Sequence, residues 1–219
     1  MSADGVGVAI KSNAPDLVPG EVGNFFFIPG QVYLANRLTG AVTLVSHSRT
    51  SPTTAGDQNS YEPQVSRDGR FVAFTSASDD LLAGQFSPGS NVFLYDHIAG
   101  STILVSRAAG TTTTGGAGRS SAPIVDADGG VVDYLSYASN LIPGQTSAAV
   151  PNVFVFDRST VTTTLVSHAA DAPASGVGAE GFLDTSAVQL SADGRYFYYL
   201  SQAANLVAGQ SGTSGGDNL

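Results

Sequence analysis

The chain has 219 residues, of which 9 are basic and 18 acidic, so its formal net charge is −9, and it contains no cysteine. This balance excludes a nucleic-acid surface, because phosphate contacts need clustered cations and the basic residues here are few and scattered. The missing cysteine excludes disulfides and thiol chemistry, and no apolar stretch approaches the roughly 18 residues that cross a membrane.

One tetrapeptide pattern recurs and divides the chain into repeats. The pattern Ser/Asp-x-Asp-Gly begins at Ser2, Ser66, Asp126 and Ser191, and its aspartates are 64, 60 and 65 residues apart. Further motifs follow each copy in the same order. A fixed period of this size indicates stacked units that bury their faces against neighbours. We therefore expect a single repeat domain over 1–219, with repeats of approximately 2–62, 63–122, 123–185 and 186–219.

The second repeat shows the expected strands most clearly. Pro63–Ser66 is predicted as a short strand that ends in a tight turn at Asp68-Gly69, a dipeptide suited to positive φ angles. Three more strands are predicted at Arg70–Ser76, Asn91–Asp96 and Ser101–Ser106, and the first two of these are apolar on both faces. Sheets covered on both sides at a regular period are typical of β-propeller blades, whereas the coils of a parallel β-helix are shorter. No segment is predicted to be a helix.

The repeated motifs resemble the TolB-type, WD-repeat-like β-propeller, in the long-repeat version of secreted bacterial proteins. The pattern P-x-h-S-x-D-G-R-h-h-A-F-x-S followed by h-Y-h-x-D-x-x-x-G carries the resemblance, where h is apolar, and it extends from Ser2 to Leu219. The resemblance implies the fold, which serves binding modules, protease gates and scaffolds alike. Relatives often carry a calcium loop before the third strand of a blade. Here glutamine replaces its first acid, for example at Gln85, so we expect no metal or other cofactor.

The ends of the chain interrupt the repeat. The first repeat lacks its first strand, and the fourth ends at Asp217–Leu219, where a third strand is expected. We therefore predict an all-β fold with propeller-type blades of four antiparallel strands, about three and a quarter blades long and incomplete at both ends. An open blade face with about 500 Å² of apolar surface left in water loses roughly 10 kcal/mol of the stabilisation that its burial would give. The expected cover is absent blades of a longer polypeptide, a second copy that closes a ring, or head-to-tail addition into a filament.

Two apolar segments are candidates for contacts with such a partner. The insertion Glu21–Gly30 contains three consecutive phenylalanines that the other repeats lack, either as a plug in the core or as a docking surface. The segment Tyr196–Leu200 is expected to form the core of the incomplete last blade, exposed if no partner covers it. The candidate assembly contacts are Phe25, Phe26, Phe27, Ile28, Tyr196, Tyr198 and Leu219.

No catalytic residue is predicted. Gly212–Gly216 fits the nucleophile-elbow pattern G-x-S-x-G, but it lies in a Gly/Ser loop with no downstream histidine. His47 and His168 share a repeat position with Arg107, and His97 shares one with arginines. A position that accepts either His or Arg indicates a structural cation at a strand end rather than a metal ligand or a general base.

Acidic residues supply two further interpretations. The aspartates of the four turns should lie near one another in a ring around the propeller axis; they are Asp4, Asp68, Asp128 and Asp193. A ring of carboxylates could bind a cation, but the glycine after each aspartate indicates turn residues. Asp133 differs, because it replaces the apolar position held by Ala9, Ala73 and Tyr198 in the other repeats. A buried carboxylate needs a partner, so Asp133 is either a satisfied structural hydrogen-bonding residue or part of a small site.

The sequence therefore predicts a non-enzymatic scaffold or adhesion module, secreted or on the cell surface, that forms a homo-oligomer or filament through its open blades. The charged share of only 12%, with abundant Ser, Thr and Gly, is common in secreted β-rich proteins. The alternatives are a propeller that binds a ligand or protein through the loops at one end of its axis, and the accessory propeller of a hydrolase whose catalytic domain is absent. The sequence does not indicate whether the chain binds a small molecule or a glycan.

Overall fold

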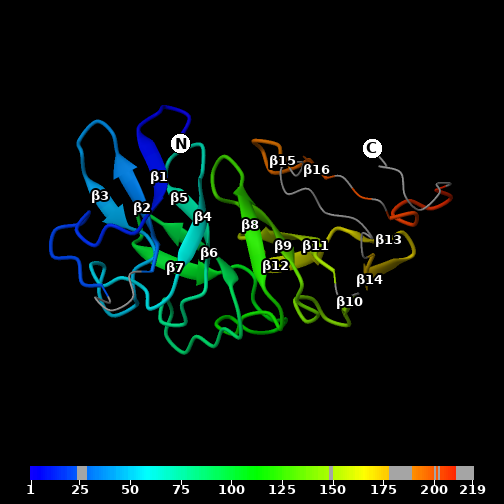
Figure 1. Cartoon of the computed structure of the whole chain (residues 1–219). Coiled ribbons are helices and arrows are strands. Elements are labelled where there is room, and N and C mark those ends of the chain that lie inside the picture. The colour runs from blue at the N-terminus through cyan, green and yellow to red at the C-terminus, as the bar shows by residue number, and fades with distance from the viewer. Residues whose placement is uncertain (24–28, 148–149, 178–188, 200, 202, 211–219) are drawn as a thin grey trace.

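The computed structural model describes residues 1–23, 29–147, 150–177, 189–199, 201 and 203–210. Within these residues every helix-or-strand element is a β-strand, and the sheets follow one another side by side along the chain (Figure 1). The all-β prediction is therefore confirmed. No helix in the described part of the chain is long and apolar enough to cross a bilayer.

The second repeat forms a complete blade, an antiparallel sheet of order β4-β5-β6-β7. Its strands are β4 (Ser60–Val65), β5 (Phe71–Ser76), β6 (Asn91–Asp96) and β7 (Ser101–Leu104). The bounds of β6 are those predicted from the sequence. β4 begins three residues before the predicted Pro63, because a bulge lets the chain keep pairing with β5 on the N-terminal side of the proline.

The third repeat repeats this blade, and the outer repeats form smaller sheets. The third blade consists of β8 (Ser120–Val125), β9 (Val131–Ser136), β11 (Asn152–Asp157) and β12 (Thr162–Leu165). The first blade has three strands, β1 (Gly7–Ser12), β2 (Gln31–Asn36) and β3 (Val42–Leu44), and the last is the hairpin of β15 (Gln189–Leu190) and β16 (Phe197–Tyr198). The described sheets thus form an open series of propeller-type blades, with no sheet that closes the series.

The loops around these blades also pair in a repeated way. A small sheet of order β10-β14-β13 joins β10 (Thr146–Ser147), β13 (His168–Ala169) and β14 (Ala172–Gly176). In the first and second repeats single bridges take its place, for example the parallel bridge between Phe86 and Thr114. Each of these repeats therefore ties the loop that leaves its last strand to the loop between its two middle strands.

The Ser-x-Asp-Gly turn is built by its side chains as well as by its glycine. Gly69 adopts a φ of 78°, where glycine lacks the steric penalty of other residues, whereas Asp68 does not have a positive φ. Instead, the carboxylate of Asp68 accepts hydrogen bonds from the Ser66 hydroxyl and from the Arg70 N–H, the latter at 3.0 Å. The prediction of positive φ angles thus holds for the glycine alone.

Neighbouring turns are joined to one another through their backbones. The N–H of Ala3 donates to the carbonyl of Arg67 at 2.8 Å, and that of Asp68 donates to Ala127 at 3.1 Å. Ala127 in turn donates to Ala192 at 3.0 Å. The four turns therefore lie next to one another in chain order, as expected for equivalent positions around an axis.

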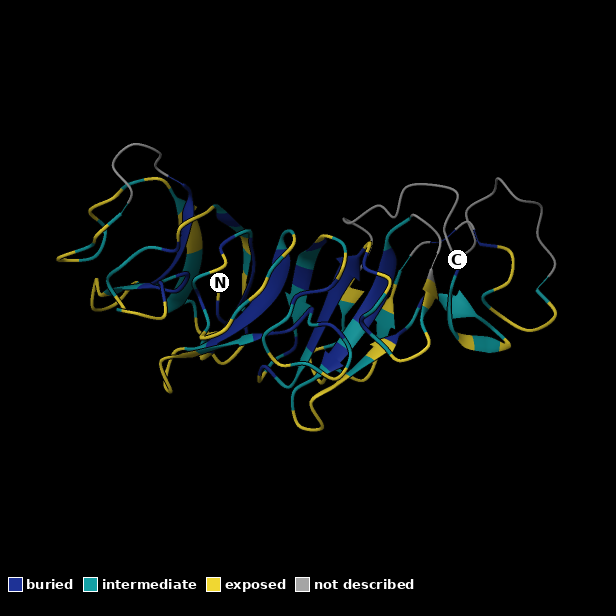
Figure 2. Ribbon diagram, turned by 90° about the horizontal axis from the view of Figure 1, so that it is seen from below, coloured by how far each residue is buried: buried dark blue, intermediate teal, exposed yellow. Residues whose placement is uncertain are grey.

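The core lies between blades. One cluster joins the first and second blades and includes Leu34, Phe74 and Phe93, and a second joins the second and third blades and includes Tyr134 and Phe154. Rings stack within each cluster, with centroids 5.6 Å apart for Phe74 and Phe93 and 5.7 Å apart for Tyr134 and Phe154. Buried residues accordingly concentrate in the middle strands, and most of the exposed residues lie in loops (Figure 2).

The outer face of the first blade is partly covered by the chain's own loop. Tyr33 and Leu44, which face away from the second blade, are both fully buried. The Tyr33 hydroxyl donates to the Ala14 carbonyl at 3.1 Å and to Glu21 Oε1 at 2.7 Å, and burial, followed by the bond to Glu21, raises the pKa of Tyr33. Ile10, which pairs with Tyr33 on this face, is nevertheless 36% exposed.

Candidate functional site

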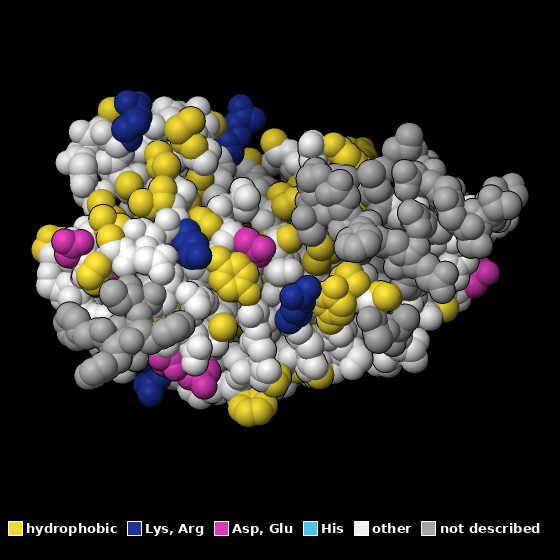
Figure 3. Space-filling view, viewed as in Figure 1, with side chains coloured by type: hydrophobic (Ala, Val, Ile, Leu, Met, Phe, Trp, Pro, Cys, Tyr) yellow, Lys and Arg dark blue, Asp and Glu magenta, His cyan; other side chains and the backbone are white. Residues whose placement is uncertain are grey.

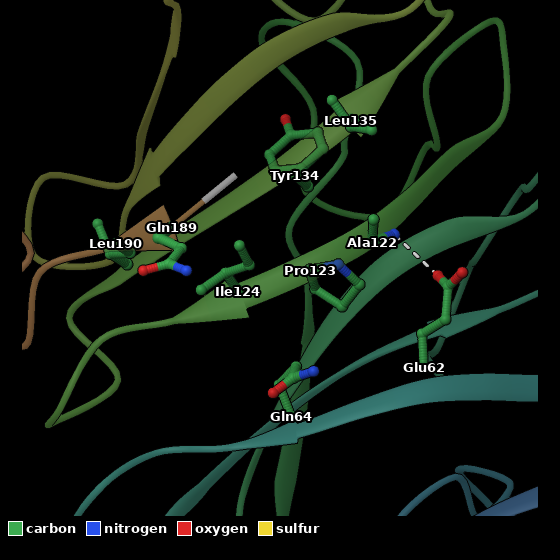
Figure 4. A pocket seen from close by; sticks show the side chains of 9 residues that line it. All are labelled: Glu62, Gln64, Ala122, Pro123, Ile124, Tyr134, Leu135, Gln189 and Leu190. Atoms are coloured by element: carbon green, nitrogen blue, oxygen red, sulfur yellow. Dashed lines mark hydrogen bonds between the residues drawn. The ribbon is translucent and has the colours of Figure 1, made fainter. Parts of the chain in front are cut away.

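A cavity lies where the first strands of three successive blades meet. Its volume is about 580 Å³. Strands β4, β8 and β15 provide most of its wall, and β9 provides the rest (Figure 4). The lining residues are Glu62, Gln64, Ala122, Pro123, Ile124, Tyr134, Leu135, Gln189 and Leu190.

Two equivalent bulges shape the wall of this cavity. Glu62 and Ala122, each directly before a proline, have φ angles of 54° and 53°, which residues other than glycine rarely adopt. The pairing of β4 with β5 and of β8 with β9 shifts register at these residues. A left-handed residue costs about 1–2 kcal/mol, so the same strained geometry in two blades requires support from neighbouring contacts.

Glu62 provides part of that support, and among the described lining residues it is the one charged side chain. Its Oε2 accepts a hydrogen bond from the Thr75 hydroxyl at 2.8 Å and another from the Ala122 N–H at 2.8 Å. The second bond crosses from the second blade to the third. With the amides of Gln64 and Gln189 nearby, this wall suits a ligand that donates hydrogen bonds.

Asp133 is a buried carboxylate next to this cavity. It lies on the same face of β9 as Leu135, is 0% exposed, and neither of its oxygens has a hydrogen-bond partner among the described residues. Burial, followed by repulsion from Asp126, raises the pKa of Asp133 to about 7. The interpretation of Asp133 as a hydrogen-bonded structural residue is therefore not supported.

Asp126 is a second unusual carboxylate, because it occupies the position that serine holds in the other turns. It is 6% exposed, and its Oδ1 has no partner in the described part of the chain. Burial is the main cause that raises the pKa of Asp126. Gly194 of the next turn packs closely here, since a Cβ at that position would come within 2.8 Å of Asp126 Oδ2.

The histidine positions hold backbone contacts. Nδ1 of His47 and of His168 each lies within hydrogen-bond distance of the carbonyl of the following residue, at 2.9 and 2.8 Å. At the equivalent position Arg107 donates to the Val161 carbonyl at 2.7 Å. These contacts support the structural interpretation. Within the described residues, no group of three or more His, Asp and Glu side chains is arranged to hold a metal ion.

The position of His97 has a structural role in two other repeats. Arg37 donates from Nε to the carbonyl of Gly5 at 2.8 Å, and Arg158 donates from Nε to the carbonyl of Gly129 at 2.6 Å. Both arginines thus hold the glycine of one of the four repeated Asp-Gly turns. Gly212–Gly216 lies outside the described residues.

Sequence reasoning missed the role of the repeated glutamine. Gln85 donates from Nε2 to the Ser78 carbonyl at 2.6 Å and accepts from the Leu82 N–H at 3.0 Å, so its amide closes the loop. Gln210 makes the same type of contacts in the last repeat. The first repeat has Glu21 at this position, which accepts from the Val18 N–H at 3.2 Å. Recurrence of one amide at a fixed distance after the second strand is the signal that points to this role.

The predicted assembly contacts lie in different surroundings. Phe25, Phe26, Phe27, Ile28 and Leu219 lie outside the described residues. Tyr196 is 68% and Tyr198 55% exposed on the last hairpin, whereas Tyr199 packs against the small cluster of Leu135 and Val153 on the third blade. The hairpin therefore directs one tyrosine toward the third blade and leaves two exposed. Charged side chains are sparse on the face shown in Figure 3.

No protein-family model matches the chain, and no curated protein matches it. Among solved structures, the chain is similar to a putative TolB from Agrobacterium tumefaciens, with 16% identity, a TM-score of 0.43, and coverage of 75% of this chain and 46% of that one. It is also similar to TolB from Acinetobacter baumannii, with 15% identity, a TM-score of 0.42, and coverage of 81% and 33%. A structure from a study of two prolyl endopeptidases has 16% identity, a TM-score of 0.45, and coverage of 79% and 23%.

The chain spans less than half the length of each of these proteins, and the likeness concerns the fold. The fold follows more directly from the strands of this chain, which form two complete four-stranded blades flanked by a three-stranded sheet and a hairpin. The chain is an all-β repeat protein made of propeller-type blades.

Proposed function

We propose that this chain is a non-enzymatic structural module, secreted or at the cell surface, that completes its open blades by binding another polypeptide chain, in the first instance a second copy. The observation that carries this proposal is the contrast between inner and outer blades. Phe74 in β5 is fully buried, whereas the equivalent Ile10 in β1 is 36% exposed. Ala73 in β5 is also fully buried, whereas the equivalent Tyr198 in β16 is 55% exposed. Apolar surface of this kind at the ends of a blade series favours association.

The experiment is a concentration series by size-exclusion chromatography with light scattering. The 22.2 kDa chain should give a mass that rises above the monomer as concentration increases. Replacing Tyr196 and Tyr198 by serine should weaken association, because it removes apolar surface from the exposed hairpin. Tyr137→Ser is the matched control, since Tyr137 is a 39% exposed tyrosine that follows β9 of the third blade and is not part of this hairpin. A strictly monomeric chain at all concentrations would contradict the proposal.

A second candidate function is ligand binding in the cavity around Glu62. The strained bulges, and the carboxylate of Glu62 among described lining residues that are otherwise uncharged, favour it. Peptides with a free amine or guanidinium group are suitable probes, titrated calorimetrically against the chain and against Glu62→Gln. Equal binding to both, or none to either, would argue against this candidate.

A further inference from the structure

The inner edge of β1 has backbone groups that no described strand pairs. β1 lies at the edge of its sheet, with β2 as its neighbour. The N–H of Arg37 donates to the Val6 carbonyl at 2.9 Å, so Val6 and every second residue after it bond toward β2. Because antiparallel strands alternate the direction of their peptide groups, those of Ala9 and Lys11 point toward the open edge.

The other blades show what such an edge binds. β4 covers the equivalent edge of β5, and β8 covers that of β9. Each covering strand begins with a serine whose hydroxyl donates to a serine on the covered strand, from Ser60 to Ser76 at 2.9 Å and from Ser120 to Ser136 at 2.8 Å. The corresponding residue of β1 is Ser12. β4 also packs beside β1 as β8 packs beside β5, so a strand added to β1 would meet a blade already in place.

The two covering strands share one sequence pattern, Ser-x-x-Pro-x-Val, in Ser60–Val65 and Ser120–Val125. The proline suits this position because the strand bulges there and needs no ladder hydrogen bond from it. The edge of β1 is already occupied at Gly7, because the Ser2 N–H donates to the Gly7 carbonyl at 2.8 Å. The Ser66 N–H donates to the Phe71 carbonyl in the same way, also at 2.8 Å. The free edge therefore takes about five residues.

Charge selects among strands of this pattern. In the second blade, Thr75 donates to the carboxylate of Glu62, the third residue of the covering strand. The position of Thr75 is held in β1 by Lys11, the one lysine of the chain, which is exposed. Within the described residues the one ion pair is Arg70–Asp96, so Lys11 has no carboxylate there. A glutamate at the third place of an added strand would give Lys11 its partner.

We propose that the inner edge of β1 binds an extended segment of a partner polypeptide with the pattern Ser-x-Glu-Pro-x, in the antiparallel register that β4 adopts on β5. The serine lies opposite Ser12, and the glutamate pairs with Lys11. This inference rests on the proposed function in that both require a second chain, but it assigns the edge, the direction and the chemistry of the added strand.

A synthetic peptide with the sequence of residues 57–65 is the probe, labelled for fluorescence anisotropy and titrated into the full chain. It should bind and slow hydrogen exchange at the amides of Ala9 and Lys11. A peptide with Gln in place of its Glu should bind roughly fivefold more weakly, the effect of one partly exposed ion pair. A scrambled peptide of the same composition is the control and should not protect these amides.

Variants at Lys11 make the assignment specific. Lys11→Met should fold, since methionine keeps an aliphatic stem beside Gly30, and it should abolish the preference for Glu over Gln. Lys11→Glu should invert the preference, so that a peptide with Lys at the third place binds better than the original. Circular dichroism checks that both variants retain the fold, and the Met variant suffices if the Glu variant does not.

Each outcome decides the inference separately from the proposed function. Lys11-dependent binding with protected amides supports the strand assignment even if light scattering shows a monomer, which would overturn self-association alone. Binding that ignores Lys11, binding without protection at Ala9 and Lys11, or the absence of binding overturns the assignment. If the chain still assembles while the peptide is bound, self-association uses another surface. If the peptide does not bind, assembly of the chain does not support the assignment of the β1 edge.

Discussion

Asp133 makes the stability of this chain depend on pH in a direction that can be worked out in advance. In the unfolded chain its carboxyl has an ordinary pKa of 3.8, and in the folded chain burial raises that pKa to about 7. The folded state therefore binds more protons than the unfolded state between these two pH values. Its free energy of unfolding falls as pH rises from about 4 to about 7. At 1.36 kcal/mol per pKa unit the loss is on the order of 4 kcal/mol.

The test replaces Asp133 by alanine, the residue found at the equivalent positions Ala9 and Ala73. We expect Asp133→Ala to raise the free energy of unfolding by about 2–4 kcal/mol at pH 8, because the uncompensated buried charge is gone. At pH 4 the substitution should change the free energy of unfolding little or lower it slightly, because the protonated carboxyl is uncharged and its burial carries no charge-desolvation penalty. Urea unfolding at pH 4, 5, 6, 7 and 8 measures both arms.

Asp171→Ala is the matched control, because Asp171 is exposed and its removal changes the net charge by the same amount. It should leave the pH dependence of the original chain unchanged. If Asp133→Ala lowers stability equally at pH 4 and pH 8, the carboxylate has a partner that satisfies its charge, and the reasoning from burial is refuted.

Two further predictions concern a glycine and an ion pair. Gly129→Ala should destabilise the chain by about 3 kcal/mol in urea unfolding, because Gly129 has a φ of 70° and a Cβ there would clash with the ring of Phe71. Gly144 has a similar φ of 69° but a Cβ there would meet nothing within 4 Å, so Gly144→Ala should cost only about 1 kcal/mol; equal losses would contradict the packing argument. The hydrogen bond from Arg70 lowers the pKa of Asp96 to about 2. The ion pair should therefore stabilise the fold by about 0.5–1 kcal/mol above pH 4, and this stabilisation should be lost as the pH falls toward 2. A double-mutant cycle with Arg70→Gln and Asp96→Asn measures the coupling at pH 7, and a coupling of zero would contradict this prediction.

Much of the fold was predictable because the repeats report the same strand several times. The strand Asn91–Asp96 is found where its apolar pattern places it. The start of β4 was not predictable, since proline normally ends a ladder, and the bulge at Glu62 that restores the pairing is held by contacts with Thr75 of the same blade and Ala122 of the next. Long-range support of this kind leaves no local sequence signal.

The candidate site was less accessible to sequence reasoning. Asp133 stood out as a carboxylate in an apolar position, but its lack of a partner depends on what faces it from other strands. Gln85 was considered only as a missing metal ligand, although its amide closes a loop. Glu62, the charged residue of the cavity, carries no distinguishing pattern, because the equivalent residue in the third blade is Ala122.

The backbone bonds between successive Ser-x-Asp-Gly turns have an evolutionary consequence. The bond from Ala3 to Arg67 and the bond from Ala127 to Ala192 join the same positions of adjacent repeats, so these two joints share one geometry. Tandem duplication of a gene segment encoding one repeat would therefore create a junction that already fits. Proteins built this way can lengthen or shorten in whole-unit steps while their sequences drift, because main-chain atoms make the join whatever side chains are carried there.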